Sequence, residues 1–377
     1  MTSAPTPGRI AAIREWLGFP VAVFLLSRVL LFVIAEQAPA LLGRPRHVAS
    51  PSVLPRGDVL AGVWNWSSPW FHFDTRWFVG VATQGYHWGS HGSANTNFLP
   101  AFPALIRLLR PLALDSAWLS SWLVANVALL AAMTVLYRWA QLRWEAPVAV
   151  RVVLLTISFP FAFFFSAPYA ESLFLALSAG AFLLAEEDRW RGAASLAAIA
   201  GVTRPVGIAL IVALALMALE RHKVKAAGLV CAGIFPLLAF SAYLAIRFGR
   251  PLGFLVNHSG GWVRAQGGVF NVLGAQFHTY LSPFDRVDAS LAVLFLASGV
   301  LAWRRIGRGY GAYVLLGVII PLVHGLTGME RYVIVLFPAM AIWGTCGGKG
   351  RQALLFSVSL AGLLVATVMF AVWYALA

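Results

Sequence analysis

Apolar stretches long enough to cross a membrane recur along almost the whole chain, from Leu17 to Ala377. A membrane-spanning helix needs about 20 mostly apolar residues, and soluble chains do not repeat such stretches. Only 11% of the residues are charged, whereas 60% are hydrophobic. Because backbone polar groups in lipid must be hydrogen-bonded within the protein, the spans are expected to be helices. The sequence therefore predicts an all-α polytopic membrane protein, with one domain over residues 1–377 and no separate soluble domain.

The alternation of apolar and polar segments predicts about nine transmembrane helices. We expect them at 17–36, 117–137, 148–165, 172–185, 226–246, 289–303, 310–323, 332–346 and 352–376. A further apolar run, 193–219, is interrupted by Thr203, Arg204 and Pro205, and proline disfavours helix at the preceding residue. Both flanks of this run are charged, so we interpret it as a short helical hairpin that enters and returns on one side. A single kinked span is the alternative.

Two long loops, 37–116 and 247–288, separate these spans. In the first loop, residues 100–112 place apolar side chains on one helical face with arginines nearby, and the centre of the second loop, 268–281, is a further candidate for a helix. Apolar residues on one helical face with arginines beside them are typical of helices that lie in the membrane interface. We therefore expect an interfacial helix in each long loop.

The basic residues of the short loops predict the orientation. All three lysines and nine arginines fall on one side of this layout: Lys223, Lys225, Lys349, Arg138, Arg143, Arg151, Arg189, Arg191, Arg304, Arg305, Arg308 and Arg351. By the positive-inside rule that side is cytoplasmic, so the amino terminus is cytoplasmic and both long loops are external. We attribute the net charge of +14 to these loops and to contact with anionic membrane lipids rather than to nucleic acid. The richness in alanine, glycine and arginine favours a bacterial plasma membrane.

Cysteine and histidine spacing gives no sign of a metal or redox site. The two cysteines, Cys231 and Cys346, lie in apolar runs, which gives no support to a disulfide framework or a cysteine metal site. The histidines lack zinc-site spacing, and the glycine pairs at 260–261 and 267–268 lack the context of a nucleotide loop. We therefore expect neither a metal nor another cofactor.

The first long loop contains a carboxylate among aromatic residues, in the segment 71–78. Asp74 follows Phe73, with His72 two residues before it and Arg76 two residues after it. A carboxylate at an aromatic membrane boundary loses solvation, so it can gain basicity and accept a proton. A purely structural ion pair between Asp74 and Arg76 is the alternative, and the residues alone leave both open.

Most of the other unusual polar residues fall on the predicted external side. They are His72, Arg76, Tyr169, Glu171, His258, Trp262, His324, Glu330 and Arg331. Arg28 and Arg204 lie inside apolar runs, where a charge is costly and favours a functional role. A buried arginine requires an anionic partner, either a carboxylate or a phosphate. For each of the two, a structural pair with a carboxylate such as Glu171 is the alternative.

Several motifs, taken in order, resemble the PIG-V type of mannosyltransferase, which is the GPI mannosyltransferase 2 family with its bacterial relatives. They are Phe73-Asp74, Gly85-Tyr86, Phe98-Leu99-Pro100-Ala101-Phe102-Pro103, Tyr169-Ala170-Glu171-Ser172, Thr203-Arg204-Pro205, Phe248-Gly249-Arg250-Pro251-Leu252 followed by Trp262, and Arg331-Tyr332 followed by Phe337-Pro338. The resemblance extends from Ser27-Arg28 to about Pro338. Two departures are Phe73, where the family usually has tryptophan, and the Phe98–Pro103 segment, where it usually has Phe-Phe-Pro-Leu-Tyr-Pro.

The resemblance implies a C-type glycosyltransferase fold and an enzyme. Such enzymes take a sugar from a polyprenyl-phosphate carrier on the non-cytoplasmic face, invert the anomeric carbon and use no nucleotide sugar. The expected partners are a polyprenyl-phosphate-mannose donor and a lipid or glycan acceptor. Asp74 is then the expected catalytic base.

The resemblance also implies a set of substrate-binding residues. They are His72, Arg76, Tyr169, Glu171, Arg204, His258, Trp262 and Arg331. Of these, Arg204, Arg331 and His258 are the candidates for stabilising the leaving phosphate.

A different class of function also fits the residues. Broken helices and intramembrane arginines occur in transporters, so a polytopic transporter or a lipid-binding membrane protein without transferase activity is the alternative. The two halves show no inverted repeat, and transporters rarely carry two long external loops with interfacial helices.

Overall fold

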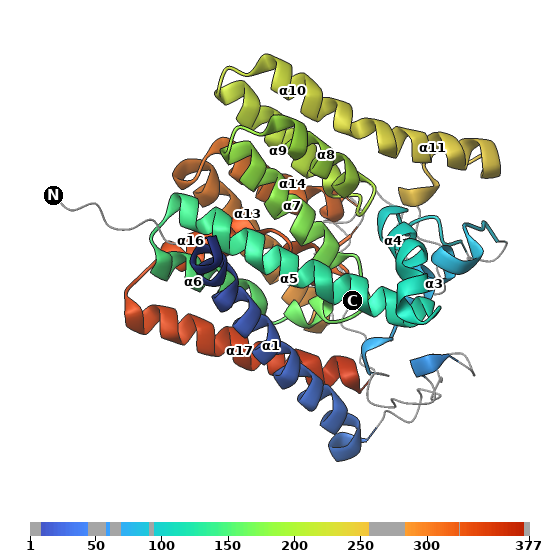
Figure 1. Cartoon of the computed structure of the whole chain (residues 1–377), viewed down its shortest axis with the longest axis horizontal. Coiled ribbons are helices and arrows are strands. Elements are labelled where there is room, and N and C mark those ends of the chain that lie inside the picture. The colour runs from blue at the N-terminus through green and yellow to red at the C-terminus, as the bar shows by residue number, and fades with distance from the viewer. Residues whose placement is uncertain are drawn as a thin grey trace.

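The structure is a computed structural model that describes residues 9–43, 58–60, 69–89, 94–255, 283–323 and 325–372. Within these ranges the chain forms α-helices and 3-10 helices and contains no strand. Most of the helices run roughly along one direction and pack as a bundle (Figure 1). The all-α prediction is therefore confirmed.

Five stretches are long and apolar enough to cross a membrane. They are Leu17–Leu42, Ala117–Arg143, Val224–Phe248, Asp285–Arg305 and Lys349–Ala371. They belong to the helices α1 (Arg9–Leu42), α5 (Ala117–Arg143), α10 (Val224–Cys231) continued by α11 (Phe235–Phe248), α13 (Pro283–Arg305) and α17 (Lys349–Ala371). Such helices are typical of an integral multi-pass membrane protein.

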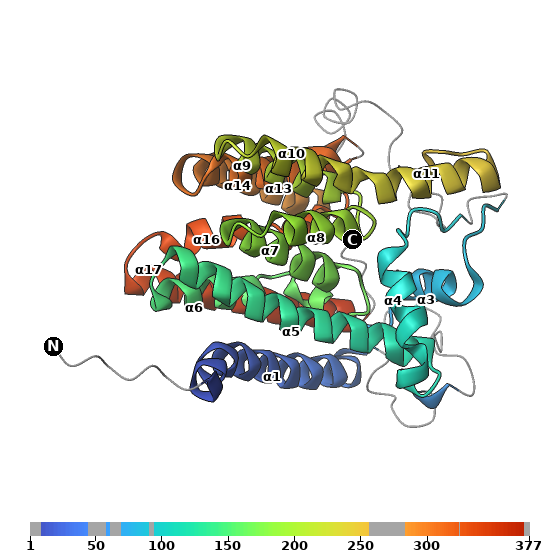
Figure 2. The same cartoon turned by 45° about the horizontal axis from the view of Figure 1, so that its top comes forward.

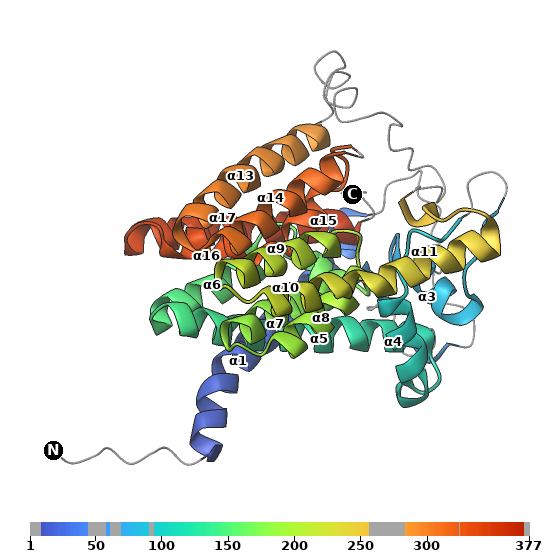
Figure 3. The same cartoon turned by 90° about the horizontal axis from the view of Figure 1, so that it is seen from above.

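Shorter helices fill the space between the long ones (Figures 2 and 3). They are α6 (Ala146–Ser158), α7 (Glu171–Glu186), α8 (Trp190–Gly201), α9 (Gly207–Glu220), α14 (Arg308–Leu322), α15 (Met329–Val333) and α16 (Phe337–Thr345). Their shared core contains fully buried aromatic side chains such as Trp139, Tyr313 and Phe182.

Proline explains two differences from the expected spans. A single helix over 148–165 is wrong, because α6 ends at Ser158, and Phe159, which precedes Pro160, has the extended ψ of 140°. A separate 3-10 helix, Ala162–Phe165, follows. The expected span 332–346 is likewise divided between α15 and α16, and α16 begins with a proline in its first turn.

The break around Arg204 forms a hairpin. Helix α8 ends at Gly201 and α9 begins at Gly207. Arg221, just after α9, pairs with Glu186, just before α8, at 2.5 Å. Both ends of the interrupted segment therefore lie together, which favours the predicted hairpin over the kinked span.

One end of the bundle collects the charged loops around Glu186. The Glu186 carboxylate accepts from Arg143, from Arg221 and from the Tyr310 hydroxyl. Arg143 also donates to the backbone oxygen of Ile306 at 2.6 Å. We call this the Glu186 end. It joins loops that the charge pattern groups on one side, and the cytoplasmic assignment of that side stays a prediction.

The first long loop contributes two helices at the other end. Helix α4 (Ala101–Leu109), with the 3-10 turn Arg110–Ala113, corresponds to the predicted interfacial helix at 100–112. Helix α3 (Thr75–Gln84), directly after Asp74, was not predicted. Both lie at the end of the bundle opposite the start of α1 (Figure 2). The second predicted interfacial helix, at 268–281, lies outside the described residues.

Candidate functional site

Asp74 lies at a strained turn directly before α3. The preceding Phe73 has a φ of 49°, in the left-handed region that a bulky side chain rarely adopts. The Tyr169 hydroxyl donates to the backbone oxygen of His72 at 3.0 Å and accepts from the Asp74 backbone nitrogen at 3.4 Å. Such strain persists only where the surroundings enforce it, and it is common at functional sites. Tyr169 is the contact that holds this turn.

Two arginines and two carboxylates form an ion cluster around this turn. Arg331 donates through Nη1 to Asp74 Oδ2 and through Nε to Glu171 Oε1, the latter at 2.8 Å. Arg204 Nη1 lies 2.6 Å from the same Glu171 oxygen. We call Asp74, Glu171, Arg204 and Arg331 the ion cluster, and the end of the bundle that contains it the Asp74 end.

The members of the ion cluster differ in access to solvent. The Glu171 side chain is fully buried and the Arg204 side chain is 9% exposed, whereas Asp74 is 23% exposed. The formal charges of the two carboxylates and the two guanidinium groups cancel. A molecule that reaches this neutral cluster therefore meets Asp74 as its accessible carboxylate.

The electrostatic environment fixes the protonation of two residues that hold Asp74. Burial lowers the pKa of Arg331, but Glu171 and then Asp74 outweigh it, so the pKa lies well above the usual value. Burial, followed by the charge of Asp74, raises the pKa of Tyr169 well above its usual value. Arg331 is therefore a permanent cation, and Tyr169 is a neutral phenol able to donate to His72.

Aromatic rings cover the guanidinium groups of the ion cluster. Arg331 lies 4.8 Å from the ring centre of Tyr169 and 5.4 Å from that of Phe164. Arg204 lies 5.0 Å from the ring centre of Tyr332. These contacts stabilise the cations where water is excluded.

The predicted alternative partner of Asp74 is wrong. Arg76 lies over the Trp77 ring at 5.2 Å, and none of the ion pairs within the described part of the chain includes it. The observed partner, Arg331, is 257 residues away along the chain. His72 is buried, and its Nδ1 lies 3.2 Å from the backbone oxygen of Phe370 rather than in the ion cluster.

The two arginines predicted at membrane depth have different partners. Arg204 pairs with Glu171, which is the structural alternative raised by the sequence. The same alternative is wrong for Arg28, whose Nη1 donates to the Ser166 hydroxyl at 2.5 Å. The remaining predicted residues, His258 and Trp262, lie outside the described residues.

A carboxylate outside the ion cluster, Asp288, holds the segment that precedes Arg331, and the sequence did not predict this role. Its two oxygens accept from the backbone nitrogens of Gly328 and Glu330, at 3.2 and 3.4 Å. The buried Glu330 carboxyl also bonds to Asp288, and burial followed by this neighbour raises the pKa of Glu330 well above its usual value. This pair holds the turn before Arg331. The only sequence signal was an acidic residue at the start of an apolar helix.

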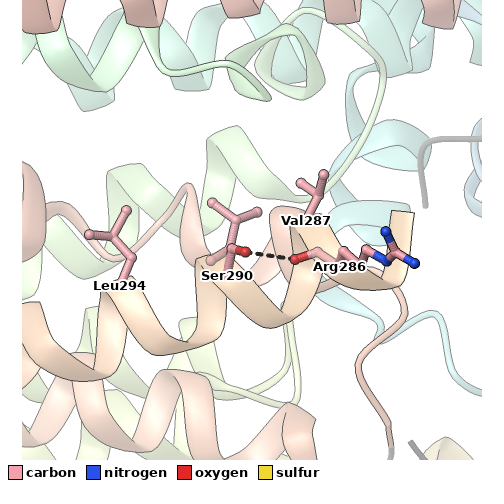
Figure 4. Close-up of a pocket in the computed structure, with 5 residues that line it drawn as sticks. Arg286, Val287, Ser290 and Leu294 are labelled. Carbon is pink, nitrogen blue, oxygen red and sulfur yellow. Dashed lines mark hydrogen bonds between the residues drawn. The ribbon is translucent and has the colours of Figure 1, made fainter. Parts of the chain in front are cut away.

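A shallow depression lies on the outer face of α13, apart from the ion cluster. It is lined by Arg286, Val287, Ser290, Leu291 and Leu294 (Figure 4). The Ser290 hydroxyl donates to the backbone oxygen of Arg286 at 2.8 Å. None of these residues belongs to the ion cluster.

The described ranges contain no group of three or more histidine, cysteine, aspartate or glutamate side chains placed to hold a metal ion. The two carboxylates of the ion cluster are instead held by guanidinium groups. The chemistry that this arrangement supports is proton acceptance by a positioned carboxylate beside fixed cations.

Comparisons with known proteins identify no family. No protein-family model matches the sequence, and no match was found among curated proteins or solved structures. The resemblance to the PIG-V type of mannosyltransferase stays a prediction from the motifs. Four of its motif residues, Asp74, Glu171, Arg204 and Arg331, are the four members of the ion cluster.

Proposed function

We propose that this protein is a membrane-embedded glycosyltransferase. It transfers mannose from polyprenyl-phosphate-mannose to a hydroxyl group of a lipid-linked or glycan acceptor, with inversion at the anomeric carbon. The proposal combines the motif resemblance with the ion cluster, and Asp74 is its catalytic base.

The observation that carries the proposal is the placement of Asp74 within the ion cluster. Arg331 binds Asp74 Oδ2 and thereby orients the carboxylate. Glu171 is buried between two arginines and has no exposed surface, whereas Asp74 keeps accessible surface. A general base must come within hydrogen-bond reach of the hydroxyl that it deprotonates, and Asp74 is the carboxylate of the ion cluster whose exposed surface an acceptor can approach.

The proposed reaction is a single displacement. The acceptor oxygen attacks the anomeric carbon of mannose while Asp74 takes the hydroxyl proton. A bond forms between this oxygen and the anomeric carbon, and the bond between that carbon and the phosphate oxygen breaks. The electron pair leaves with the polyprenyl phosphate, whose developing charge requires cationic support.

The proposal includes an architecture and an orientation. Nine spans and the hairpin form a C-type glycosyltransferase fold in which the shorter helices, such as α7, also cross the bilayer. Helix α7 has 16 residues, about 24 Å at 1.5 Å per residue, with Glu171 of the ion cluster at its first position and Glu186 at its last. In this arrangement the amino terminus and the Glu186 end are cytoplasmic, and the Asp74 end is on the outer face of a bacterial plasma membrane.

Sugar transfer in membranes tests the proposed function. Membranes that contain the protein receive polyprenyl-phosphate-mannose with a radiolabelled sugar, and membranes without the protein serve as the control. We expect label in a lipid or glycan fraction only where the protein is present. A polyprenyl phosphate that carries labelled glucose in place of mannose should give no comparable transfer. Equal labelling in both membranes contradicts the proposal.

The broken helix at Arg204 is the observation that favours the alternative, a transporter or lipid-binding membrane protein. Charged groups at a helix break near membrane depth are common in transporters. The transfer experiment separates the two functions, because a transporter moves labelled lipid without moving the sugar to an acceptor.

A further inference from the structure

Arg28 is a buried cation without a charged partner among the described residues. It lies on α1 inside the candidate span Leu17–Leu42, and 8% of its surface is exposed. Its Nη1 donates to the Ser166 hydroxyl, while its Nε and Nη2 are buried and have no hydrogen-bond partner within the described residues. A charge inside an apolar span is costly unless an anion accompanies it. Arg28 therefore combines burial with unpartnered donor groups, which are the properties of an anion-binding residue.

The ion cluster does not offer a free cation for that ligand. Arg331 contacts both Asp74 and Glu171, and Arg204 contacts Glu171, so two positive charges meet two negative charges. An added phosphate at this cluster would compete with a carboxylate for its arginine. Arg28 has no such competitor within the described ranges, and the two nitrogens without a partner there, Nε and Nη2, lie on the same edge of the guanidinium group. That edge matches two oxygens of a phosphate.

A short chain segment, 166–171, connects the partner of Arg28 to the ion cluster. Ser166 precedes Glu171 by five residues, in the short turn that also carries Tyr169. On the other side of this turn, the ring of Phe163 lies 4.9 Å from that of Phe370, whose backbone oxygen contacts His72. An anion bound at Arg28 therefore lies next to the segment that positions Asp74.

The outer face of α1 is suited to a lipid. It carries exposed apolar side chains at Leu25, Leu26, Val29, Leu30 and Val33. In the most apolar stretch of this span only 17% is buried, against 28% to 56% in the other four candidate spans. Of the five candidate spans, α1 is thus the least covered by protein, so the chain of a lipid can lie along its exposed face.

We propose that Arg28 and Ser166 bind the phosphate group of a lipid, namely the polyprenyl phosphate of the donor. Nε and Nη2 of Arg28 donate to two phosphate oxygens, and the Ser166 hydroxyl, which accepts from Nη1, donates its proton to a third. The identity of the lipid rests on the proposed function, whereas the phosphate site rests on the unpartnered guanidinium. Arg28 is thereby added to the residues that the sequence offered for holding the phosphate, which were Arg204, Arg331 and His258.

The rise in melting temperature that a bound ligand causes in the purified full-length protein tests this site. Melting temperature in detergent is measured with polyprenyl phosphate, phosphatidylglycerol or inorganic phosphate. The variants are Arg28→Met, Arg28→Lys and Ser166→Ala, with Arg304→Gln as a control that removes an exposed arginine from α13. We expect polyprenyl phosphate to raise the melting temperatures of the wild type and of Arg304→Gln by the same amount. Arg28→Met should lose at least tenfold in affinity, and Arg28→Lys, which keeps the charge without the fork, should lose less.

The lipid-free melting temperature separates a ligand site from a structural role. Removal of an unpaired buried charge should leave the lipid-free Arg28→Met protein as stable as the wild type or more stable. Wild-type affinity of Arg28→Met for polyprenyl phosphate overturns the proposal, and if that variant does not fold, wild-type affinity of Arg28→Lys overturns it. If phosphatidylglycerol or inorganic phosphate raises the melting temperature as much as polyprenyl phosphate does, the assignment to a polyprenyl carrier is overturned. Because binding is read without sugar transfer, failure of this site and failure of the transferase proposal are distinguishable.

Discussion

Glu171 is the residue on which the ion cluster depends, since it is fully buried and receives both Arg204 and Arg331. We expect Glu171→Gln to lower the free energy of unfolding by about 3–5 kcal/mol, because it leaves Arg204 as an uncompensated buried charge. Denaturant titration in detergent measures the change. Glu187→Gln, which removes a carboxylate from an exposed pair with Arg189, is the matched control and should have little effect. Equal stability of both variants would show that the cluster is not structural.

Glu330 makes stability depend on pH. Burial and the neighbouring Asp288 raise its pKa in the folded protein above the usual value of 4.5, so the folded state binds the proton more tightly than the unfolded state. This contribution is fully present below pH 4.5 and is lost as the pH rises through the folded pKa. We expect Glu330→Gln to flatten the decline of melting temperature above pH 4.5. The exposed Glu145→Gln should keep the wild-type slope, and an identical slope in both variants contradicts the assignment.

At the residue scale, the sequence identified the individual site residues and raised the Arg204–Glu171 pair, but it did not identify the partner of Asp74. Asp74 was recognisable because aromatic residues flank it in a chain with 14 acidic residues. Its partner was not, because Arg76 is near in sequence, whereas Arg331, on α15, meets Asp74 only in the folded chain. Pairing in a helical bundle is a property of tertiary structure, so local spacing predicted the wrong arginine.

At the element scale, the hairpin depends on a glycine at its turn. A Cβ at Gly207 would lie 2.5 Å from the backbone oxygen of Ala200 and 2.6 Å from the Cα of Gly201. We expect Gly207→Ala to lower the free energy of unfolding by roughly 1–3 kcal/mol, because backbone atoms must move apart. Gly228→Ala in α10 is the control, since its Cβ meets nothing within 4 Å, and it should be neutral or slightly stabilising. If Gly207→Ala melts like Gly228→Ala, the close approach of α8 and α9 is contradicted.

The apolar pattern predicted where the helices lie better than where they end. Hydropathy placed the long helices α5, α13 and α17 correctly, because a sustained apolar run in lipid has no alternative to helix. It joined α6 to the following 3-10 helix, since Phe159, Pro160 and Phe161 are as apolar as the helix itself. The backbone restriction imposed by proline, rather than hydropathy, sets that boundary.

At the scale of the whole molecule, two charged clusters lie at opposite ends of α7. The ion cluster occupies one end and Glu186, with its arginines, the other. The orientation prediction is tested by cysteine labelling after Cys231 and Cys346 are replaced by serine. We expect a membrane-impermeant reagent to label cysteine at the exposed Gln84 in intact cells, and cysteine at the exposed Glu187 only after the cells are opened. The reverse pattern would place the ion cluster in the cytoplasm.

The proposed function requires that the accessible carboxylate of the ion cluster removes the acceptor proton. Its most direct test is mannose transfer from polyprenyl-phosphate-mannose by purified wild type, Asp74→Asn and Asp115→Asn. The last variant is the control, because Asp115 is an exposed carboxylate paired with Arg110, apart from the ion cluster. Asp74→Asn keeps the shape of the side chain and removes its basicity. We predict that it folds and transfers mannose at least about 100-fold more slowly than the wild type, while Asp115→Asn is unchanged. Near-normal transfer by folded Asp74→Asn contradicts the account.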